Sequence, residues 1–351
     1  MGGGDRQVAL CVYRVLDVQL VQDLLEEVPV RPDDRWGRRH RSILPHRAVN
    51  KVADVTDDPA EEFSGHRARL FGLAYRLLGS AAEAEDAVQD SYLRWNAADR
   101  AAIATPGAWL AKVLTNICLN RLTSARALRE EYVGPWLPEP VLTDEPLETA
   151  EQRDSISMAF LVLLERLTPA ERAVFVLREA FSYGYREIAD VLELSEANCR
   201  QLHRRARQRV GERRRFDASA QARRRIVERF LLAAENGDLA GLESVLAADV
   251  VAWSDGGGRV SSALRPVVGA AKVCRYLAGL AARAAGTGVR LGLAEVNGEP
   301  AVLAFLDGGL FSVFVVESDG DLVHGLRVVV NPDKLAYLAG QLSQREGVAG
   351  S

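Results

Sequence analysis

The segment over residues 185–215 constrains the fold of this chain more than any other. Tyr185 to Leu192 has the spacing of a short amphipathic helix, Glu193 and Leu194 interrupt it, and Ser195 is a favourable N-cap for a second helix. That second helix is strongly basic, with eight arginines among residues 200–215. Two short helices joined by so tight a turn predict a helix-turn-helix with one face left free.

This basic strip stands out because the whole chain of 351 residues carries a formal net charge of −4. A recognition helix meets base edges with its first turns and phosphates with its later ones. We therefore expect DNA binding here, with the acidic remainder of the chain contacting protein. The residues expected at base edges are Glu196, Asn198, Arg200, Gln201 and Arg204, and those expected at phosphates are Arg205, Arg207, Arg209 and Arg213.

Two amphipathic helices are predicted near the start of the ordered chain. The first begins near Phe63 and ends at Gly79, a residue suited to the C′ position. Ser80 and Glu83 form a possible capping box for the second helix, which extends to about Ala97 and is acidic on one side. On charge alone, that acidic side is typical of a solvated surface near a helix start.

A further helix is predicted to begin at Thr105 and Pro106, as N-cap and first helical residue. Its face opposite the apolar stripe is polar and partly basic, with side chains that can bond bases and phosphates or simply remain hydrated. The polar face comprises Lys112, Asn116, Asn120 and Ser124, spaced four residues apart, and it is followed by Arg121, Arg126 and Arg129.

The segment after this helix is too rich in proline to be helical. Trp136 and Leu137 lie between Pro135 and Pro138, which is unusually apolar for a linker. We therefore expect an extended segment that docks on another part of the protein. Helices resume over residues 148–167, and Thr168, Pro169 and Glu171 have the pattern that starts the next one.

In order and spacing, residues 63–215 resemble an extracytoplasmic-function (ECF) sigma factor, a bacterial initiation subunit of RNA polymerase. The resemblance implies promoter DNA and core RNA polymerase, through its clamp helices and flap, as partners. By residue it implies a core-polymerase contact at Asp86, Gln89 and Asp90; minus-ten reading at Lys112, Asn116, Asn120 and Arg121; and minus-thirty-five reading at Asn198, Arg200, Gln201, His203, Arg204 and Arg207. Many family members carry Asp where this chain has Asn120, which leaves the promoter sequence open.

The last third of the chain predicts an α+β domain, with helices followed by strands joined at Asp307-Gly308 and Asp319-Gly320. It resembles the SnoaL-like, cystatin-type cone. Three motifs, WLPEP, DGGG and NPDKL, are similar to those of the J-type sigma subgroup with a fused SnoaL-like tail. They give the expected interdomain regulatory residues: Trp136, Leu137, Pro138, Glu139, Pro140, Asp255, Gly256, Gly257, Gly258, Asn331, Pro332, Asp333, Lys334 and Leu335.

The expected protein is therefore multidomain, with two all-α sigma domains and a C-terminal α+β SnoaL-like domain. The expected boundaries are a poorly ordered extension (1–60), sigma domain 2 (61–130), a linker (131–147), sigma domain 4 (148–215), the SnoaL-like domain (218–340) and a tail (341–351). The extension could reflect a start codon placed too early, with the natural start near Val52 or Val55.

Composition and motif searches favour a cytoplasmic protein that is not an enzyme. The four cysteines and five histidines are scattered, so neither metal nor cofactor is expected, and apolar runs are too short for a membrane helix. His324 is expected inside the cone, without a second acid or base on the neighbouring strand faces for proton transfer. An unknown small ligand could still bind there.

Taken together, these patterns predict a promoter-specificity factor controlled by its own tail. The cone is expected to dock on the sigma domains through the three motifs and to set the spacing of the two DNA-reading domains. Two alternatives remain: a helix-turn-helix activator with a ligand-binding tail, and a cyclase-like or isomerase-like enzyme.

Overall fold

A computed structural model describes residues 59–143, 156–211 and 218–349. The expected poorly ordered extension and the alternative start sites fall outside this part of the chain, apart from Pro59 and Ala60. Among the described helices, none combines the length and the apolar character needed to cross a membrane.

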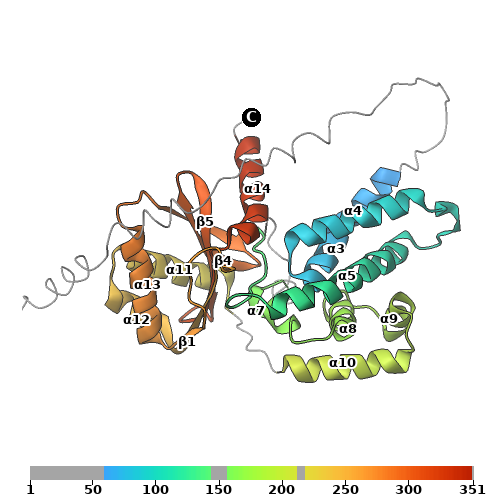
Figure 1. Ribbon diagram of the computed structural model, residues 1–351, viewed down its shortest axis with the longest axis horizontal. Helices are drawn as coiled ribbons and strands as arrows, with labels where there is room; N and C mark the ends of the chain where they lie inside the picture. Colours follow the sequence, from blue (N-terminus) through green and yellow to red (C-terminus); the bar gives the residue numbers. More distant parts are fainter. Residues whose placement is uncertain (1–58, 144–155, 212–217, 350–351) are drawn as a thin grey trace, which may run out of the picture. The chain divides into compact units, whose positions relative to one another are not determined.

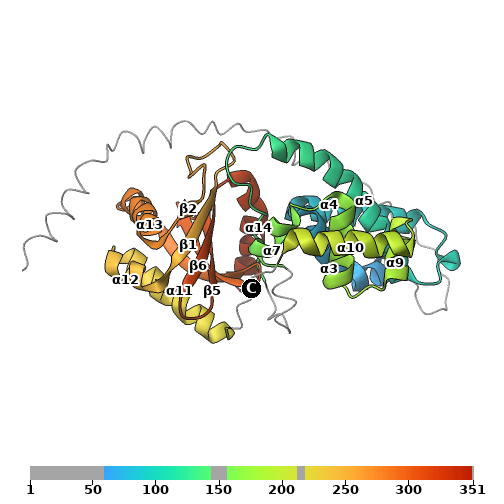
Figure 2. The same cartoon turned by 90° about the horizontal axis from the view of Figure 1, so that it is seen from below.

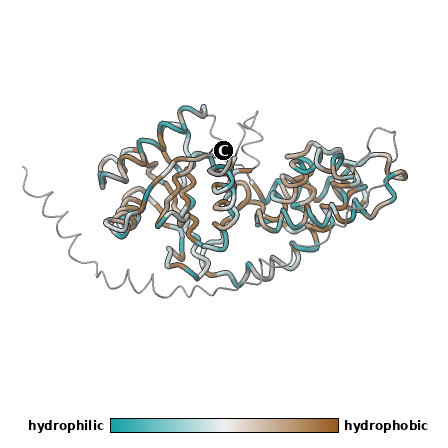
Figure 3. Tube along the Cα trace, turned by 90° about the horizontal axis from the view of Figure 1, so that it is seen from above, coloured by the Kyte–Doolittle hydropathy of each residue, from teal (hydrophilic) through white to brown (hydrophobic). Residues whose placement is uncertain are grey.

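The first domain, sigma domain 2 of the expected scheme, consists of α3 (Pro59–Leu78), α4 (Ala81–Ala97), a short 3-10 helix (Arg100–Ala102) and α5 (Pro106–Glu130). Gly79 ends α3 as expected, with φ 71° and its N–H donating to Tyr75 O at 2.8 Å. The apolar stripes of the three helices face one another, and Trp95 is completely buried between them. Figure 3 shows hydrophobic and hydrophilic residues alternating along these helices.

The second domain, sigma domain 4, contains α7 (Met158–Leu164), α8 (Pro169–Glu179), α9 (Tyr185–Leu192) and α10 (Glu196–Val210). The capping box at the start of α8 is confirmed, because Thr168 N donates to the Glu171 carboxylate and Glu171 N donates to Thr168 Oγ1. Ser195 caps α10 as expected, accepting from Asn198 N at 3.2 Å. The turn between α9 and α10 closes with Glu193 in the left-handed region at φ 56°.

The two helical domains share one hydrophobic core. Buried residues of α3, α4 and α5 continue without a break into those of α7, α8, α9 and α10. Helix α8 packs against α3 and α5, and α9 packs against α5. The pair therefore behaves as one packed unit in this conformation.

The third domain, called the cone below, is the expected α+β domain. It contains α11 (Ala220–Glu235), α12 (Leu239–Val245), α13 (Ala270–Ala284) and α14 (Pro332–Ala349) around a six-stranded sheet. The strands are β1 (Leu246–Asp255), β2 (Val267–Val268), β3 (Arg290–Val296), β4 (Glu299–Leu306), β5 (Gly309–Ser318) and β6 (Val323–Val329), in the order β2-β1-β6-β5-β4-β3. Strand β1 runs parallel to β6, and the other neighbours are antiparallel.

Each face of the sheet has its own core. Helices α11, α12 and α13 cover one face, and α14 lies on the opposite one (Figures 1 and 2). The core under α14 also takes in Leu137 and Leu142 of the linker and Met158 of α7. One face of the cone is thus completed by residues from outside the cone.

Two details of the cone differ from the sequence-based expectation. Helix α14 begins at Pro332 and runs to Ala349, well past residue 340, where the domain was expected to end. Strands β3 and β4 are joined by an Asn297-Gly298 turn with φ values of 55° and 71°, which was not among the expected turns. The expected Asp307-Gly308 turn between β4 and β5 is confirmed, with φ values of 51° and 82°.

Candidate nucleic-acid interface and interdomain junction

Helix α4 presents the expected acidic face to solvent. Asp86 and Gln89 are exposed, and so is Leu93, which follows Gln89 by one helical turn and is 59% exposed. Asp90 is half-buried because its carboxylate pairs with Arg121 Nη2 at 2.7 Å. An acid expected to bind the polymerase and a cation expected to read DNA therefore neutralise each other.

The expected DNA-reading residues of α5 differ in exposure. Asn120 is exposed, whereas Asn116 and Arg121 are half-buried. Lys112 is also half-buried, and its Nζ lies 3.0 Å from Glu193 Oε1 in the helix-turn-helix of the second domain. In this conformation, part of the α5 face is held against the second domain.

Five of the six residues expected to read the minus-thirty-five element lie on the solvent side of α10. These exposed residues are Asn198, Arg200, Gln201, Arg204 and Arg207. Arg200 pairs with Glu196 one turn earlier and stacks over the Tyr185 ring, with 4.6 Å between the guanidinium carbon and the ring centroid. Arg204, Arg205 and Arg207 are exposed on the same helix, whereas Arg209 pairs with Glu171 of α8.

His203 does not share this surface. Its side chain is only 7% exposed, its Nδ1 bonds Tyr185 OH and its Nε2 bonds Glu179 Oε1, both at 2.8 Å. It lies on the inner face of α10 with Cys199 and Ala206. Both ring nitrogens are thus used inside the domain, which corrects its expected placement among the DNA-reading residues.

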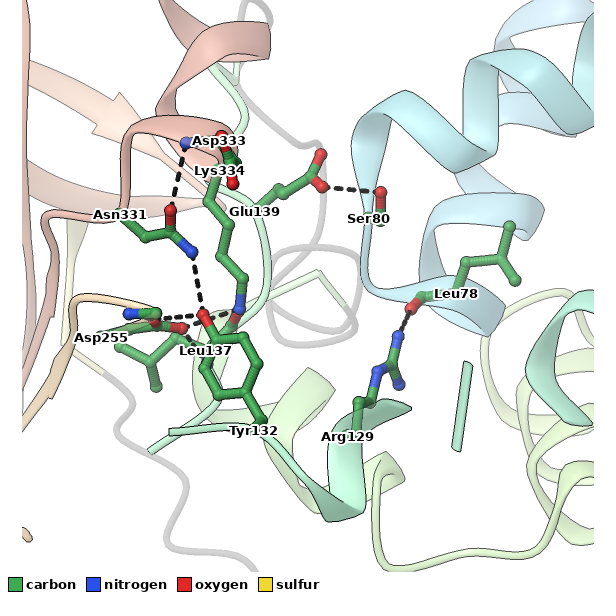
Figure 4. A network of polar contacts seen from close by, with 11 residues as sticks. Leu78, Ser80, Arg129, Tyr132, Leu137, Glu139, Asp255, Asn331, Asp333 and Lys334 are labelled. Carbon is green, nitrogen blue, oxygen red and sulfur yellow. Dashed lines mark hydrogen bonds and ion pairs between the residues drawn. The ribbon is translucent and has the colours of Figure 1, made fainter. Parts of the chain in front are cut away.

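The three motifs meet around Asp255, at what we call the junction: Tyr132, Leu137, Asp255, Asn331 and Lys334. Leu137 N donates to Asp255 Oδ2 at 2.7 Å, and Lys334 Nζ donates to Leu137 O at 2.5 Å and to Asp255 Oδ2 at 2.7 Å. Tyr132 OH donates to Asp255 Oδ1 at 2.6 Å and accepts from Asn331 Nδ2 at 2.9 Å. Figure 4 shows these side chains converging from the linker, the end of β1 and the start of α14.

Charge and burial make the junction specific. Asp255 is completely buried, and Lys334, at 7% exposure, is the cation paired with it. Burial lowers the pKa of Lys334 to about 8, although the Asp255 carboxylate acts in the opposite direction. Two cations lie over the Trp136 ring, with Arg129 Cζ 4.0 Å and Lys334 Nζ 4.2 Å from the ring centroid. Removing either Asp255 or Lys334 would leave the other as an uncompensated buried charge, so the junction depends on this pair.

The remaining motif residues support this arrangement. Pro138, Pro140 and Leu335 are buried, and Pro332 is the first residue of α14. Asp333 pairs at 2.7 Å with Arg259, the residue that directly follows the glycines of the DGGG motif. A methyl group added to Gly256 would lie 2.2 Å from Val260 O, so this glycine is required for the turn.

Glu139 has a separate role at the start of α4. Its carboxylate accepts from Ser80 Oγ at 2.7 Å, from Ala81 N at 2.8 Å and from Ala82 N at 3.1 Å. Ser80 also accepts from Glu83 N as expected, but Glu83 does not complete the predicted capping box. The acid that serves this helix start comes instead from the linker, about sixty residues later in the chain.

Several residues of the contact region were not found from the sequence. Tyr75, Tyr132 and Asn297 supply buried or half-buried polar contacts across domains, and Tyr337 of α14 donates to Glu85 of α4 at 3.1 Å. Arg172 of α8 is 2% exposed, donates to Arg76 O and pairs with Glu165. Asn297-Gly298 could have been noticed as a turn signal, but the contacts themselves carry no local signature.

His324 is half-buried and has a partner that was not expected. His324 Nε2 lies 2.7 Å from Asp319 Oδ2, in the turn between β5 and β6. Burial raises the pKa of Asp319, but hydrogen bonds from Leu322 N, His324 and Asp321 N outweigh it and lower the value to about 2. The carboxylate is thus engaged in shaping the turn. Within the described ranges, no cluster of His, Cys, Asp and Glu could hold a metal ion. A small ligand in the cone stays a prediction.

Comparisons with known proteins agree with this architecture. The family models for Sigma-70 region 2 and for Sigma-70, region 4 match residues 63–128 and 157–210. The ECF RNA polymerase sigma factor SigJ of Mycobacterium tuberculosis (strain H37Rv) is 41% identical over 246 residues, which cover 68% of this chain and 78% of that protein. The probable ECF sigma factor SigI of the same organism is 33% identical over 291 residues, 82% of this chain and 98% of that protein.

The similarity extends to three dimensions. The crystal structure of Mycobacterium tuberculosis SigJ matches with a TM-score of 0.64 at 34% identity, over 79% of this chain and 98% of that one. Residues 59–211 make up less than half of the chain, so this coverage extends beyond the two helical domains into the cone. With two sigma-region matches, the identity to SigJ and this shared architecture, the chain belongs to the family of ECF RNA polymerase sigma factors.

Proposed function

We propose that this chain is a non-enzymatic initiation subunit that binds core RNA polymerase in the cytoplasm, directs it to promoters, and is regulated by its own cone. The strongest support for this proposal is that two helices matched by the sigma-region models carry exposed polar side chains. Polar faces of α4 and α10 are presented to solvent within the residues that the Sigma-70 region 2 and region 4 models match.

The contact with core polymerase is proposed to centre on α4. Asp86 and Gln89 supply an exposed acidic and polar rim, and Leu93 adds an exposed apolar side chain on the same helical face. An apolar centre surrounded by polar groups is typical of a protein interface, and acidic groups favour a basic partner helix.

Promoter recognition is proposed to use α5 and α10. The amides and cations of α5 suit a single strand of DNA, since they can bond both bases and phosphates. On α10, Gln201 and Arg204 are placed in the first turns, where base edges are read, and Arg207 follows at a position suited to phosphate.

Regulation by the cone is proposed to act through the junction. Its buried Asp255–Lys334 pair binds the linker backbone on both sides of one residue, through Leu137 N and Leu137 O. The linker is the covalent connection between the two sigma domains. A cone that holds the linker therefore restricts how far those domains can separate.

The polymerase contact is tested by binding of the full chain to purified core enzyme. The double variant Asp86→Arg/Gln89→Arg should lose binding by at least roughly tenfold, because it reverses the charge of an exposed face without touching the core. Glu243→Arg on α12 makes the same type of charge change on an exposed residue of the cone and should bind normally. Equal binding of both variants would contradict the proposed contact between α4 and the polymerase.

Transcription with core enzyme and no other sigma subunit distinguishes the remaining alternative. A sigma factor starts transcription in this mixture, whereas a helix-turn-helix activator does not. Regulation is measured in the same assay with Lys334→Met, which should change the yield from a fixed promoter several-fold. Lys272→Met, on the exposed side of α13, is the matched control. Unchanged yield with Lys334→Met would remove the junction from regulation.

A further inference from the structure

We propose that the Asn297-Gly298 turn of the cone couples docking of the cone to closure of the two sigma domains. The inference rests on the proposed regulation by the cone and adds a second contact, distant in sequence from the WLPEP, DGGG and NPDKL motifs. A single amide side chain in this turn bonds sigma domain 2, the linker and the residue that precedes α7.

The side chain of Asn297 is completely buried and all of its polar atoms have partners. Its Nδ2 donates to Tyr75 OH at 2.6 Å and to Ile156 O at 2.9 Å, and its Oδ1 accepts from Val141 N at 3.2 Å. The backbone takes part as well, because Asn297 N donates to Val141 O at 3.0 Å and Gly298 N donates to Thr143 Oγ1 at 2.8 Å. A buried amide with every bond formed is a specific contact, since any displacement leaves polar groups unpaired.

The partners of Asn297 belong to three different parts of the chain: sigma domain 2, the linker and the segment before α7. Tyr75 is in α3 of sigma domain 2, and its hydroxyl also donates to Glu139 O of the linker at 2.6 Å. Ile156 comes just before Ser157, which caps α7 of sigma domain 4. Val141 is in the linker. Because one amide serves all three, the bonds form together only when both sigma domains and the cone are in place.

Closure of the sigma domains has a direct consequence for DNA reading. In the closed form Lys112 of α5 pairs with Glu193 at the turn of the helix-turn-helix. Arg172 of α8 is buried against the end of α3 and shares Glu165 with Arg129 of α5. These contacts must break when the two DNA-reading domains separate, and the Asn297 bonds add to them only while the cone is docked.

An Asn-Gly turn could also serve only to fold the cone. The test variant must therefore keep the turn and remove only the bonds to the other domains. Asp-Gly and Asn-Gly both favour the same hairpin geometry. Asn297→Asp therefore keeps the shape and the turn but replaces the Nδ2 donor by a carboxylate oxygen, which faces Ile156 O. Asp307→Asn makes the reverse change in the exposed turn between β4 and β5, which has the same backbone conformation.

The measurement uses pairs of spin labels on the full chain. Asn96→Cys with Gln208→Cys reports the separation of the two sigma domains, and Asn96→Cys with Glu243→Cys reports docking of the cone. These three positions are exposed, while Cys118, Cys199 and Cys274 are buried; Cys11 is replaced by Ser. Distance distributions are then recorded for the parent, Asn297→Asp and Asp307→Asn.

We expect Asn297→Asp to raise the fraction of long distances roughly tenfold for both pairs, because two bonds of a buried amide are lost. Asp307→Asn should leave both distributions unchanged. Tyr75→Phe removes the hydroxyl that joins Asn297 to Glu139, and should act in the same direction without adding to Asn297→Asp. Circular dichroism checks that each variant keeps its helices and sheet.

If Asn297→Asp lengthens the cone distance but not the distance between the sigma domains, the turn only attaches the cone and the coupling is wrong. Unchanged distances in both pairs also overturn it. Should both pairs lengthen while transcription by core enzyme stays at the parent level, the coupling stands and regulation by the cone fails. The two ideas can therefore be rejected separately.

Discussion

Around Asp255, close packing depends on a backbone that carries no side chains. Gly257 has φ 59°, and a methyl group built on it would lie 2.3 Å from Asn331 Nδ2 and 3.0 Å from Tyr132 OH. Gly79, at the end of α3, is similar, because a methyl group there would lie 2.7 Å from the ring of Trp136. At both positions glycine is needed twice, for the positive φ and for the space that a junction residue or linker residue occupies.

This double requirement can be separated experimentally. Gly257→Ala should destabilise the chain by more than the cost of placing an L-residue at positive φ, which is about 1–2 kcal/mol. Gly288→Ala is the control, since Gly288 has φ 77° and open space around it. The free energy of unfolding in urea gives both values, and spin labels at Asn96→Cys and Glu243→Cys show whether the cone has moved. Equal costs without movement would mean that Asn331 adjusts without loss.

At the scale of elements, α4 is completed by a residue from another part of the chain. The N-terminus of a helix has unpaired N–H groups and a partial positive charge, and a carboxylate stabilises both. Glu139 supplies this carboxylate through three hydrogen bonds. The helix proposed to bind polymerase is therefore linked to the position of the linker.

Glu139→Ala should cost about 1–2 kcal/mol and should weaken the first turn of α4 in particular. Hydrogen exchange of the Ala81 and Ala82 amides, read by mass spectrometry, should become faster by roughly tenfold or more, since loss of a cap opens the first turn. The matched control is Ser219→Ala, which removes the cap of α11 and should affect only that helix. Slow exchange at Ala81 in Glu139→Ala would show that Ser80 alone suffices.

Helix α10 leads to a prediction about promoter selection. Arg204→Ala should reduce discrimination between promoter and random DNA by about 1–3 kcal/mol if it reads a base. His203→Ala should lower the stability of the helix-turn-helix instead, because it breaks bonds to Tyr185 and Glu179. Fluorescence anisotropy with both DNAs at several salt concentrations separates these effects. A uniform loss on every sequence for Arg204→Ala would assign it to phosphate.

The elements themselves were largely predictable, because their signals are local. Caps at Thr168 and Ser195, the Gly79 helix end and the Asp307-Gly308 turn are short-range features of the sequence. His203 was misplaced because a basic helix hides its inner face among many polar residues. The spacing of Cys199, His203 and Ala206 was the available signal, since it marks one side of a helix.

Contacts across domains were less predictable. The WLPEP, DGGG and NPDKL motifs suggested that three segments meet, yet the pairing of Asp255 with Lys334 and of Glu139 with α4 requires the fold. Such bonds join residues separated by tens to hundreds of positions, and nothing in the neighbouring sequence specifies the partner. Tyr75 and Asn297 are the clearest cases, because each is an ordinary residue in its own element.

At the scale of the whole molecule, the shared core predicts that the two sigma domains unfold together. Leu164 of α7 is completely buried in the common cluster, so Leu164→Ala should cost about 2–5 kcal/mol. Hydrogen exchange in increasing urea should show this loss in peptides of α3, α4 and α5 as well as in α7–α10. Val316→Ala, in the core between the sheet and α11–α13, should lower protection mainly in the cone. Loss confined to α7–α10 would contradict a common core.

The shared core also affects how readily the two sigma domains can separate. Drawing the sigma domains apart in water exposes apolar surface, at a cost of about 25 cal/mol for each Å². Their extended arrangement is therefore scarce unless another surface covers the apolar residues that separation exposes. Chains that are not bound to the enzyme would stay in the closed form and would leave promoters unoccupied. The number of promoters in use would then depend on how much core enzyme is free as well as on the amount of this chain.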